Sequence, residues 1–326
     1  MDNNHVVIGI DGGGTNTRVI VSDKHGHVLA YLERGSASIY KDKEAASNVR
    51  GAIAEALQQA GRTAADVQAL VAGIAGYDAP SDLEWVTPLT ELAGLACPKM
   101  HVNDAVSAHS GALMGRPGIV VIAGTGSIIV GVTEDGQFIR NYDFHHYAAT
   151  AARSIAYDTV YEVLAGEYDE SDQPFLKAIL AHWGVASLGG LAQIAKQGFA
   201  ADRRERDKLF GEFAPAVTKA AEQGSPVAIR VCERAIDQIK IGIELIAFSF
   251  ASEEVAVAFI GSVANSSYYL HALRGKLAQG NHKRYLITLP QFSPAIGSVL
   301  LALKQAGISI DDNVIHQLQR FESSNR

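Results

Sequence analysis

The chain has 326 residues, of which 48% are hydrophobic and 19% are charged. This length is enough for two domains but not for three, and the composition allows a sizeable core and excludes an intrinsically disordered chain. The formal net charge of −7 argues against a nucleic-acid partner, because a phosphate-binding surface needs an excess of basic residues. The one dense basic stretch, Asp202–Lys208, alternates in sign, which is typical of a solvated helix face.

The two cysteines, Cys97 and Cys232, are far apart in the sequence and form no CxxC pair. This count disfavours a disulfide framework, a zinc site and an iron–sulfur cluster held by this chain alone. No signal-like segment precedes the first predicted strand, and no apolar run reaches the roughly 18 residues that span a bilayer. We therefore expect a cytoplasmic protein without a membrane partner.

The first part of the chain predicts a three-strand meander followed by alternating helices and strands. The predicted strands are Val6–Asp11, Thr15–Ser22, Val28–Glu33, Val67–Gly76 and Lys99–Asp104. The predicted helices are Lys41–Gly61, Ser81–Leu95 with an interruption at Pro88, and one that runs from Asp104 to Gly115.

The pattern begins again at Gly118, which indicates an internal duplication whose second copy carries a helical insert. The predicted strands are Gly118–Gly124, Ile128–Gly136, Gln137–Tyr142, Glu254–Val263 and Arg284–Pro290. Helices are predicted across about Thr150–Phe250 and at Asn265–Gln279, Pro294–Ala306 and Asp311–Phe321. We expect two lobes that share a cleft, formed by residues 1–115 together with about 296–326, and by residues 116–295.

A run of three glycines, Gly12–Gly14, joins the first two predicted strands, with Asp11 before it and Thr15 and Thr17 after it. Glycines let a backbone turn approach a ligand closely and direct several N–H groups toward it, as in a phosphate cradle. Asp11 is suited to bind Mg²⁺ directly or through water. The alternative is a tight hairpin that needs glycine for a positive φ, and this segment alone does not decide between them.

The segment Ile122–Ser127 stands at the equivalent point of the second copy. Two related glycine–hydroxyl hairpins facing one cleft are suited to hold a polyphosphate from both sides, which favours the phosphate interpretation. A P-loop and a dinucleotide fingerprint are excluded, because GxxxxGK[ST] is absent and the first glycine run precedes a strand. Gly261 and Ser262 follow a third strand, where they are candidates to border a base or ribose or to form a plain turn.

Asp104 ends a predicted strand and starts a predicted helix. A kinase that acts on a hydroxyl needs a base near that hydroxyl. The alternative role, a helix N-cap, is compatible with this one, with Asn103 orienting a sugar hydroxyl. Asp78 is a weaker candidate for the catalytic base. The adjacent His145 and His146 are predicted on a strand with their side chains pointing apart, which disfavours a metal site.

With these segments placed, the sequence resembles the superfamily of acetate and sugar kinases, Hsc70 and actin. Within it the sequence is similar to the BadF/BadG/BcrA/BcrD ATPase group, which includes N-acetylglucosamine kinase and bacterial glucosamine kinase. The matching segments follow the family's order over nearly the whole chain. They are Gly9–Asp23, Gly73–Gly76, Val102–His109, Ile122–Ser127, Phe259–Ala264 and Pro294–Leu303.

The resemblance implies an α/β fold of two ribonuclease-H-like, actin-like ATPase lobes that close on ATP, Mg²⁺ and a small substrate such as an amino sugar. It also implies a homodimer, Asp104 as the catalytic base, Asp11 as the magnesium-linked aspartate, and Gly261 and Ser262 beside adenosine. The implied phosphate-binding residues are Gly12, Gly13, Gly14, Thr15, Asn16, Gly124, Thr125, Gly126 and Ser127. The implied substrate-binding residues are Gly76, Asn103, Asp104 and Thr125.

Two segments depart from the family's pattern. The usual asparagine-containing GxxN stretch after the third strand is replaced by Arg34–Tyr40, which has no asparagine. Thr150, Ala151 and Ala152 stand where Asp, Glu and Gly are expected. The missing carboxylate normally grips sugar hydroxyls, so the nucleotide half matches the family while the sugar half is rewritten.

Three functions are consistent with this pattern. The first is a small-molecule kinase that acts on an amino sugar or a related hydroxyl compound. The second is an ATPase activator of a reductase, a branch that uses bridging cysteines, although Cys97 and Cys232 lie outside the expected context. The third is a degenerate kinase that senses a ligand without turnover.

Overall fold

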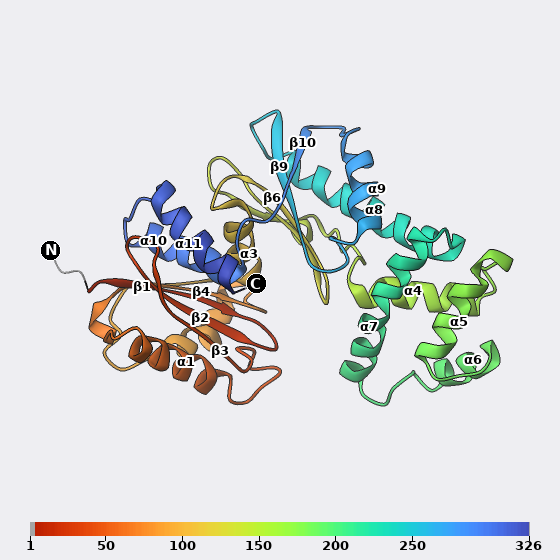
Figure 1. Ribbon diagram of the computed structural model, residues 1–326, viewed down its shortest axis with the longest axis horizontal. Helices are drawn as coiled ribbons and strands as arrows, with labels where there is room; N and C mark the ends of the chain where they lie inside the picture. Colours follow the sequence, from red (N-terminus) through yellow and green to blue (C-terminus); the bar gives the residue numbers. More distant parts are fainter. Residues whose placement is uncertain (1–3, 326) are drawn as a thin grey trace. The chain divides into compact units, whose positions relative to one another are not determined.

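The computed structural model describes residues 4–325, and its elements are labelled in Figure 1. The strands are β1 (Val6–Gly12), β2 (Thr17–Asp23), β3 (Val28–Arg34), β4 (Val67–Ile74), β5 (Lys99–Asn103), β6 (Gly118–Ala123), β7 (Ser127–Val132), β8 (Phe138–Arg140), β9 (Glu254–Ile260) and β10 (Arg284–Thr288). The helices are α1 (Ala45–Gln59), α2 (Leu83–Val86), α3 (Asp104–Leu113), α4 (Ala152–Leu164), α5 (Gln173–His182), α6 (Leu188–Lys196), α7 (Arg203–Glu222), α8 (Pro226–Ala247), α9 (Ser267–Leu277), α10 (Pro294–Gln305) and α11 (Asp312–Ser324).

Three local predictions are wrong. The helix expected from Lys41 begins only at Ala45, so Lys41 lies in the loop before it. The helix expected over Ser81–Leu95 contracts to α2, followed by a 3₁₀ turn over Thr87–Thr90, because Pro88 has no backbone N–H to continue an α-helix. The two adjacent histidines lie after β8 in a turn rather than on a strand, and His145 has a left-handed backbone with φ of 53°.

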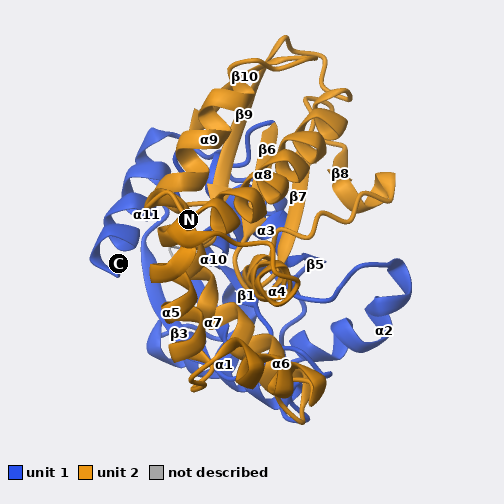
Figure 2. Ribbon diagram, turned by 90° about the vertical axis from the view of Figure 1, so that its right-hand side faces the viewer, with its two compact units in different colours: residues 1–117, 289–326 blue, residues 118–288 orange. Residues whose placement is uncertain are grey.

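The chain forms two compact units, residues 1–117 with 289–326 and residues 118–288, coloured separately in Figure 2. Their sheets have the orders β3-β2-β1-β4-β5 and β10-β9-β6-β7-β8. In each sheet the meander strands pair antiparallel and the later strands pair parallel. The duplicated meander and the ribonuclease-H-like fold class are therefore confirmed. Whether the units are independent domains with the boundaries expected above remains a prediction.

The sheet of unit 1 (residues 1–117 and 289–326) buries both of its faces. Side chains on β1 alternate, so that Ile8 and Ile10 join the core that α1 covers, while Val7 joins the core that α10 covers. Figure 1 shows α1 on one side of this sheet and α10 and α11 on the other. Gly9 lets α10 lie directly on β1, because a Cβ there would be 2.5 Å from the backbone nitrogen of Val299.

Helices α3 and α10 cross closely beneath the carboxyl end of β1. A Cβ on Gly297 would lie only 1.9 Å from the carbonyl oxygen of Ser107, so this crossing requires glycine. The buried Ser298 hydroxyl lies 2.7 Å from the carbonyl of Ile10, to which it donates, and 2.8 Å from the Ser107 hydroxyl. These contacts hold the end of β1 and the start of α3 in register, and Asp11 and Asp104 lie at those two points.

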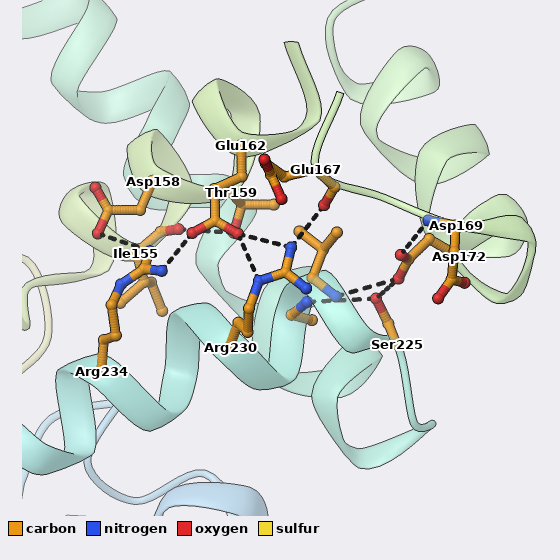
Figure 3. A network of polar contacts seen from close by, with 12 residues as sticks. Ile155, Asp158, Thr159, Glu162, Glu167, Asp169, Asp172, Ser225, Arg230 and Arg234 are labelled. Carbon is orange, nitrogen blue, oxygen red and sulfur yellow. Dashed lines mark hydrogen bonds and ion pairs between the residues drawn. The ribbon is translucent and has the colours of Figure 1, made fainter. Parts of the chain in front are cut away.

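The helical insert of unit 2 (residues 118–288) continues the core of its sheet through α4, α7 and α8. A polar network joins α4 to α8, as Figure 3 shows. Glu162 accepts from Arg230 Nη2 at 3.0 Å and also pairs with Arg234. At the start of α8, the buried Asp172 accepts hydrogen bonds from the Ser225 hydroxyl and the backbone N–H of Val227. Over residues 4–325, no helix is both long enough and apolar enough to span a membrane.

Candidate functional site

The glycines of the β1–β2 turn are required by close packing. A Cβ on Gly12 would lie 2.6 Å from Ile74 Cδ1 and 2.9 Å from Ala37 Cβ. The N–H of Gly13 donates to the carbonyl of Asn16 at 2.9 Å and closes the turn. None of Gly12–Gly14 has a positive φ, so the alternative that the hairpin needs glycine for a left-handed backbone is wrong.

A row of charged side chains lies at the base of this turn. Asp11 is buried and accepts a hydrogen bond from Arg18 Nη1 at 3.2 Å, since the two residues are directly paired across β1 and β2. Arg18 Nε also lies 3.5 Å from a carboxylate oxygen of Glu33. Burial raises the pKa of Asp11, and this effect exceeds the opposing influence of Arg18. The side-chain amide of Asn16 donates to Glu33, while Thr15 is exposed at the tip of the turn.

Asp104 is the first residue of α3, and Asn103 is its N-cap. The Asn103 side chain accepts from the N–H of Ala105 at 2.9 Å, and it donates to the carbonyl of Tyr77 at 2.9 Å and to Asp78 Oδ1 at 3.0 Å. The N-cap role suggested for Asp104 is therefore wrong by one residue. Asn103, and not Asp104, holds the N-cap position, and the amide of Asn103 is engaged at both of its ends.

The surroundings of Asp104 make it a weak acid. Burial is the largest cause, and the negative charges of Asp11 and Asp78 add to it, while the N–H of Ala105 opposes them. Together they raise the pKa of Asp104 from 3.8 to about 6. A carboxylate with such a pKa is ionised at neutral pH and is a stronger base than an exposed one, which suits general-base catalysis.

The loop that follows β4 completes the surroundings of Asp104. Gly76 has a φ of +85°, and a Cβ there would meet nothing within 4 Å. Its backbone therefore favours glycine, although the space beside it is open. The next two residues are Tyr77 and Asp78, which bind Asn103, so Gly76, Asn103 and Asp104 belong to one local cluster.

In unit 2 the β6–β7 turn meets the loop after β9. The N–H of Gly124 donates to the carbonyl of Gly126 at 2.9 Å, and a Cβ on Gly124 would lie 3.5 Å from Gly261 Cα and 3.8 Å from the nitrogen of Ser262. Gly261 has a φ of +100°, and a Cβ there would lie 2.3 Å from the carbonyl of Ala123. The structure therefore brings the second and third glycine segments of the sequence together.

The segment that replaces the expected sugar-gripping carboxylates packs against this turn. Thr150 is fully buried, and its hydroxyl is hydrogen-bonded to the hydroxyl of Ser127. Tyr142 donates to the carbonyl of Ser127 at 2.6 Å, and Arg153 Nη1 donates to the carbonyl of Thr125 at 3.4 Å. The hydroxyl of Ser127, expected to hold phosphate, is thus engaged within the unit.

Three cations near the glycine turns were not found from the sequence. Arg18 pairs with Asp11, Lys41 lies over Gly14, and Arg153 contacts Thr125. The signal for Arg18 was present, because a turn centred on Gly13–Asn16 places it opposite Asp11 in the hairpin. No pattern in the sequence marks Lys41 or Arg153.

The acidic cluster of unit 1 fits a magnesium ion that has few protein ligands. Asp11 and Asp78 raise the pKa of Asp104 by repulsion, and a divalent cation beside them would relieve it. Among residues 4–325 no group of three or more His, Cys, Asp or Glu side chains is arranged to hold a metal. Mg²⁺ bound to nucleotides commonly takes only one or two carboxylates, with water and phosphate oxygens as its other ligands.

Comparisons with known proteins place this geometry in context. The chain is 25% identical over 300 residues to the N-acetylmuramic acid/N-acetylglucosamine kinase of Clostridium acetobutylicum, covering 91% of this chain and 97% of that protein. It is 25% identical over 262 residues to a glucosamine kinase of Vibrio cholerae, covering 79% and 84%. The crystal structure of a putative N-acetylglucosamine kinase from Chromobacterium violaceum is similar, with a TM-score of 0.66, 26% identity, and coverage of 92% and 99%.

A family model matches residues 8–302, a span that includes both glycine turns, Asp104 and the Gly261 loop. The chain belongs to the BadF/BadG/BcrA/BcrD ATPase family.

Proposed function

We propose that this protein is an ATP-dependent kinase that transfers the γ-phosphate to a hydroxyl of an amino sugar. The observation that carries the proposal is Asp104, a partly buried carboxyl at the start of α3 whose pKa is raised to about 6. Membership of an ATPase family supports the nucleotide, and the names of the relatives support an amino sugar such as N-acetylglucosamine or glucosamine.

In this mechanism Asp104 accepts the proton of the acceptor hydroxyl as that oxygen attacks phosphorus. The bonds from Asn103 to Tyr77 and Asp78 fix the strand end and the helix start that position the carboxylate. The substrate would contact Gly76 and Asn103 in this cluster, and Thr125 in unit 2. A bound magnesium ion, linked to Asp11, would neutralise charge on the phosphates.

Each unit would bind the nucleotide through its glycine turn. In unit 1, the turn Gly12–Gly14 would bind phosphate oxygens, with Thr15 and Asn16 at its tip. In unit 2, Gly124–Ser127 would bind phosphate and Gly261–Ser262 would border adenosine. The close approach of Gly124 to Gly261 supports a single binding surface within this unit.

The cysteines argue against an activator of a reductase. Cys232 is fully buried, and burial raises the pKa of its thiol to about 12. Burial also raises the pKa of Cys97. A cluster needs thiolate ligands that a partner can reach. Cys232 does not meet that condition, and Cys97 is only partly exposed, so the two cysteines do not form an accessible pair of ligands.

A coupled assay of ADP release, run with amino sugars, muramic acid derivatives and simple hexoses, tests the kinase. We expect at least one amino sugar to stimulate ADP release, and we expect Asp104→Asn to lower that turnover by about 10³-fold or more while ATP still binds. Asp312→Asn is the matched control, because Asp312 is also the first residue of a helix but lies exposed on α11. Unchanged turnover in Asp104→Asn would remove Asp104 from its role, and ATP binding without stimulated turnover would favour the sensor.

A further inference from the structure

Lys41 lies on the glycine turn of unit 1. A Cβ built on Gly14 would be 2.5 Å from Lys41 Nζ, 3.0 Å from Cε and 3.2 Å from Cδ. The whole end of this side chain therefore covers Gly14, in space that any other residue at position 14 would obstruct. Lys41 is exposed to solvent, so a ligand at the turn has access to its ammonium group.

The loop that carries Lys41 is fixed to the turn by hydrogen bonds. The N–H of Ala37 donates to the carbonyl of Gly13 at 3.1 Å, and the N–H of Lys41 itself donates to the carbonyl of Ser38 at 3.0 Å. From α1, the side chain of Asn48 donates to the carbonyl of Ser36 at 3.1 Å and to Asp42 Oδ2 at 2.9 Å. This asparagine ties both ends of the loop together, so the position of Lys41 is built into the fold.

The ammonium group of Lys41 has no carboxylate partner among residues 4–325, unlike the guanidinium group of Arg18. Arg18 pairs with Asp11 and Glu33, whereas Lys41 makes no ion pair with any residue in the described range 4–325. An ammonium group held over a glycine turn without a carboxylate partner is arranged to receive an anion.

The position of the turn indicates which anion. Asp11 directly precedes the turn, and its charge acts on Asp104. The acceptor hydroxyl must lie at Asp104 and must face the phosphorus atom that it attacks. We propose that Lys41 binds the terminal phosphoryl oxygens of ATP at Gly14. Lys41 is then a catalytic residue that stabilises charge on the group being transferred, an inference that rests on the proposed kinase function.

Calorimetric titration of the full chain with a non-hydrolysable ATP analogue, ADP and AMP tests this assignment. Removing a charged hydrogen bond to the terminal phosphate in Lys41→Met should weaken the analogue about 10- to 100-fold and ADP by less than about threefold. Lys41→Arg keeps the charge and should stay within about fivefold of the wild type. Lys43→Met, which removes an exposed lysine two residues away, should bind all three nucleotides as the wild type does.

The outcomes separate this inference from the kinase proposal. A wild-type protein that binds no ATP overturns both. If the wild type binds the analogue and Lys41→Met binds it equally well, only the role of Lys41 falls. Equal weakening of the analogue, ADP and AMP also overturns it, because the contact is then not with the terminal phosphate. The last outcome is a Lys41→Met variant that binds nucleotides normally and shows only a raised KM for acidic sugars. That result assigns the ammonium group to a substrate carboxylate and likewise overturns the inference.

Discussion

The two glycine turns occupy equivalent places in sheets of the same topology, yet their chemistry differs. The turn of unit 1 is surrounded by ionisable groups, which are Asp11, Arg18, Glu33, Lys41 and Asp104. The turn of unit 2 is built from backbone and hydroxyl contacts, with Ser127 bonded to Thr150 and Gly124 packed on Gly261.

This difference indicates that the two glycine turns contribute different properties to the protein. The unit 1 turn carries charge, so changes there should alter turnover and pH dependence. The unit 2 turn depends on close backbone packing, so changes there should alter folding and nucleotide affinity. Under the proposed function, the same topology would hold a reactive site in unit 1 and a nucleotide-binding surface in unit 2, and the following predictions test that contrast.

The largest effect is expected from Gly261→Ala. Its Cβ would lie 2.3 Å from the carbonyl of Ala123 on a backbone with φ of +100°, so both strain and a backbone clash oppose it. We expect a loss of about 3 kcal/mol or more in the free energy of unfolding, measured with urea, together with weaker ATP binding.

Gly126→Ala is the control within the same surface, because a Cβ there meets nothing within 4 Å and φ is not positive. It should change the free energy of unfolding by less than about 1 kcal/mol. Equal losses in the two variants would contradict the packing argument for unit 2.

Asp104→Asn should stabilise the protein without ligand while abolishing turnover. The pKa of Asp104 is raised in the folded state from 3.8 to about 6, so the folded protein holds this proton more tightly than the unfolded chain. The free energy of unfolding therefore falls as pH rises from about 4 to about 6 and stays lower above that range. Asparagine removes this loss, and at pH 8 the variant should be more stable by about 2–3 kcal/mol.

The comparison of urea unfolding at pH 4 and pH 8 checks this sign. At pH 4 the folded carboxyl is neutral and the unfolded one is only about half ionised, because its ordinary pKa is 3.8, so the difference between the variant and the wild type should shrink to less than about 1 kcal/mol. A variant that is less stable than the wild type at pH 8 would mean that the carboxylate is structural, and unit 1 would lose its distinction from unit 2.

In unit 2, Ser127 and Thr150 should behave as a stabilising pair. Thr150→Val leaves the hydroxyl of Ser127 without its partner, and Ser127→Ala does the same to the buried hydroxyl of Thr150. Each single change should lower the free energy of unfolding by about 1–2 kcal/mol, and the double variant should lose clearly less than the sum. Strict additivity in thermal or urea unfolding would show that the two hydroxyls do not depend on each other.

The duplicated fold was predictable because local sequence patterns, repeated in both halves of the chain, indicate its strands and turns. Glycine turns between apolar strands recur at Gly12 and Gly124, and the strands around them pair as the meander required. The position of Asp104 at a strand–helix junction was also predictable from a change of period. Asn and Asp are equally good N-caps, so propensity could not tell Asn103 from Asp104. The hydrogen bonds from Asn103 to Tyr77 and Asp78 explain why Asn103 holds the N-cap position.

The remaining site features depend on contacts between distant segments. The sequence predicted Lys41 at the start of a helix, but that helix begins at Ala45, and Lys41 lies in the preceding loop, which Asn48 ties to α1 beside Gly14. Thr150 meets Ser127 across an intervening hairpin. The sequence also left open why the first turn needs glycine. The structure shows that Gly12 is required by close packing against Ile74 and not by a positive φ.

The smallest expected effect concerns the pH dependence of turnover. With Asp104 as the base, kcat/KM should fall as pH drops through about 6, the pKa of that carboxyl. Asp78 contributes less to this pKa than burial and Asp11 do. Asp78→Asn removes its negative charge while its side-chain oxygen still accepts from Asn103, so the acidic limb should move to lower pH by a few tenths of a unit. Asp143→Asn, on the exposed turn of unit 2, should leave the limb where it is. A limb that moves to higher pH in Asp78→Asn would show that the Asp78 carboxylate does not act on Asp104 by charge, and the acidic cluster of unit 1 would then be no more than a structural hydrogen-bond network.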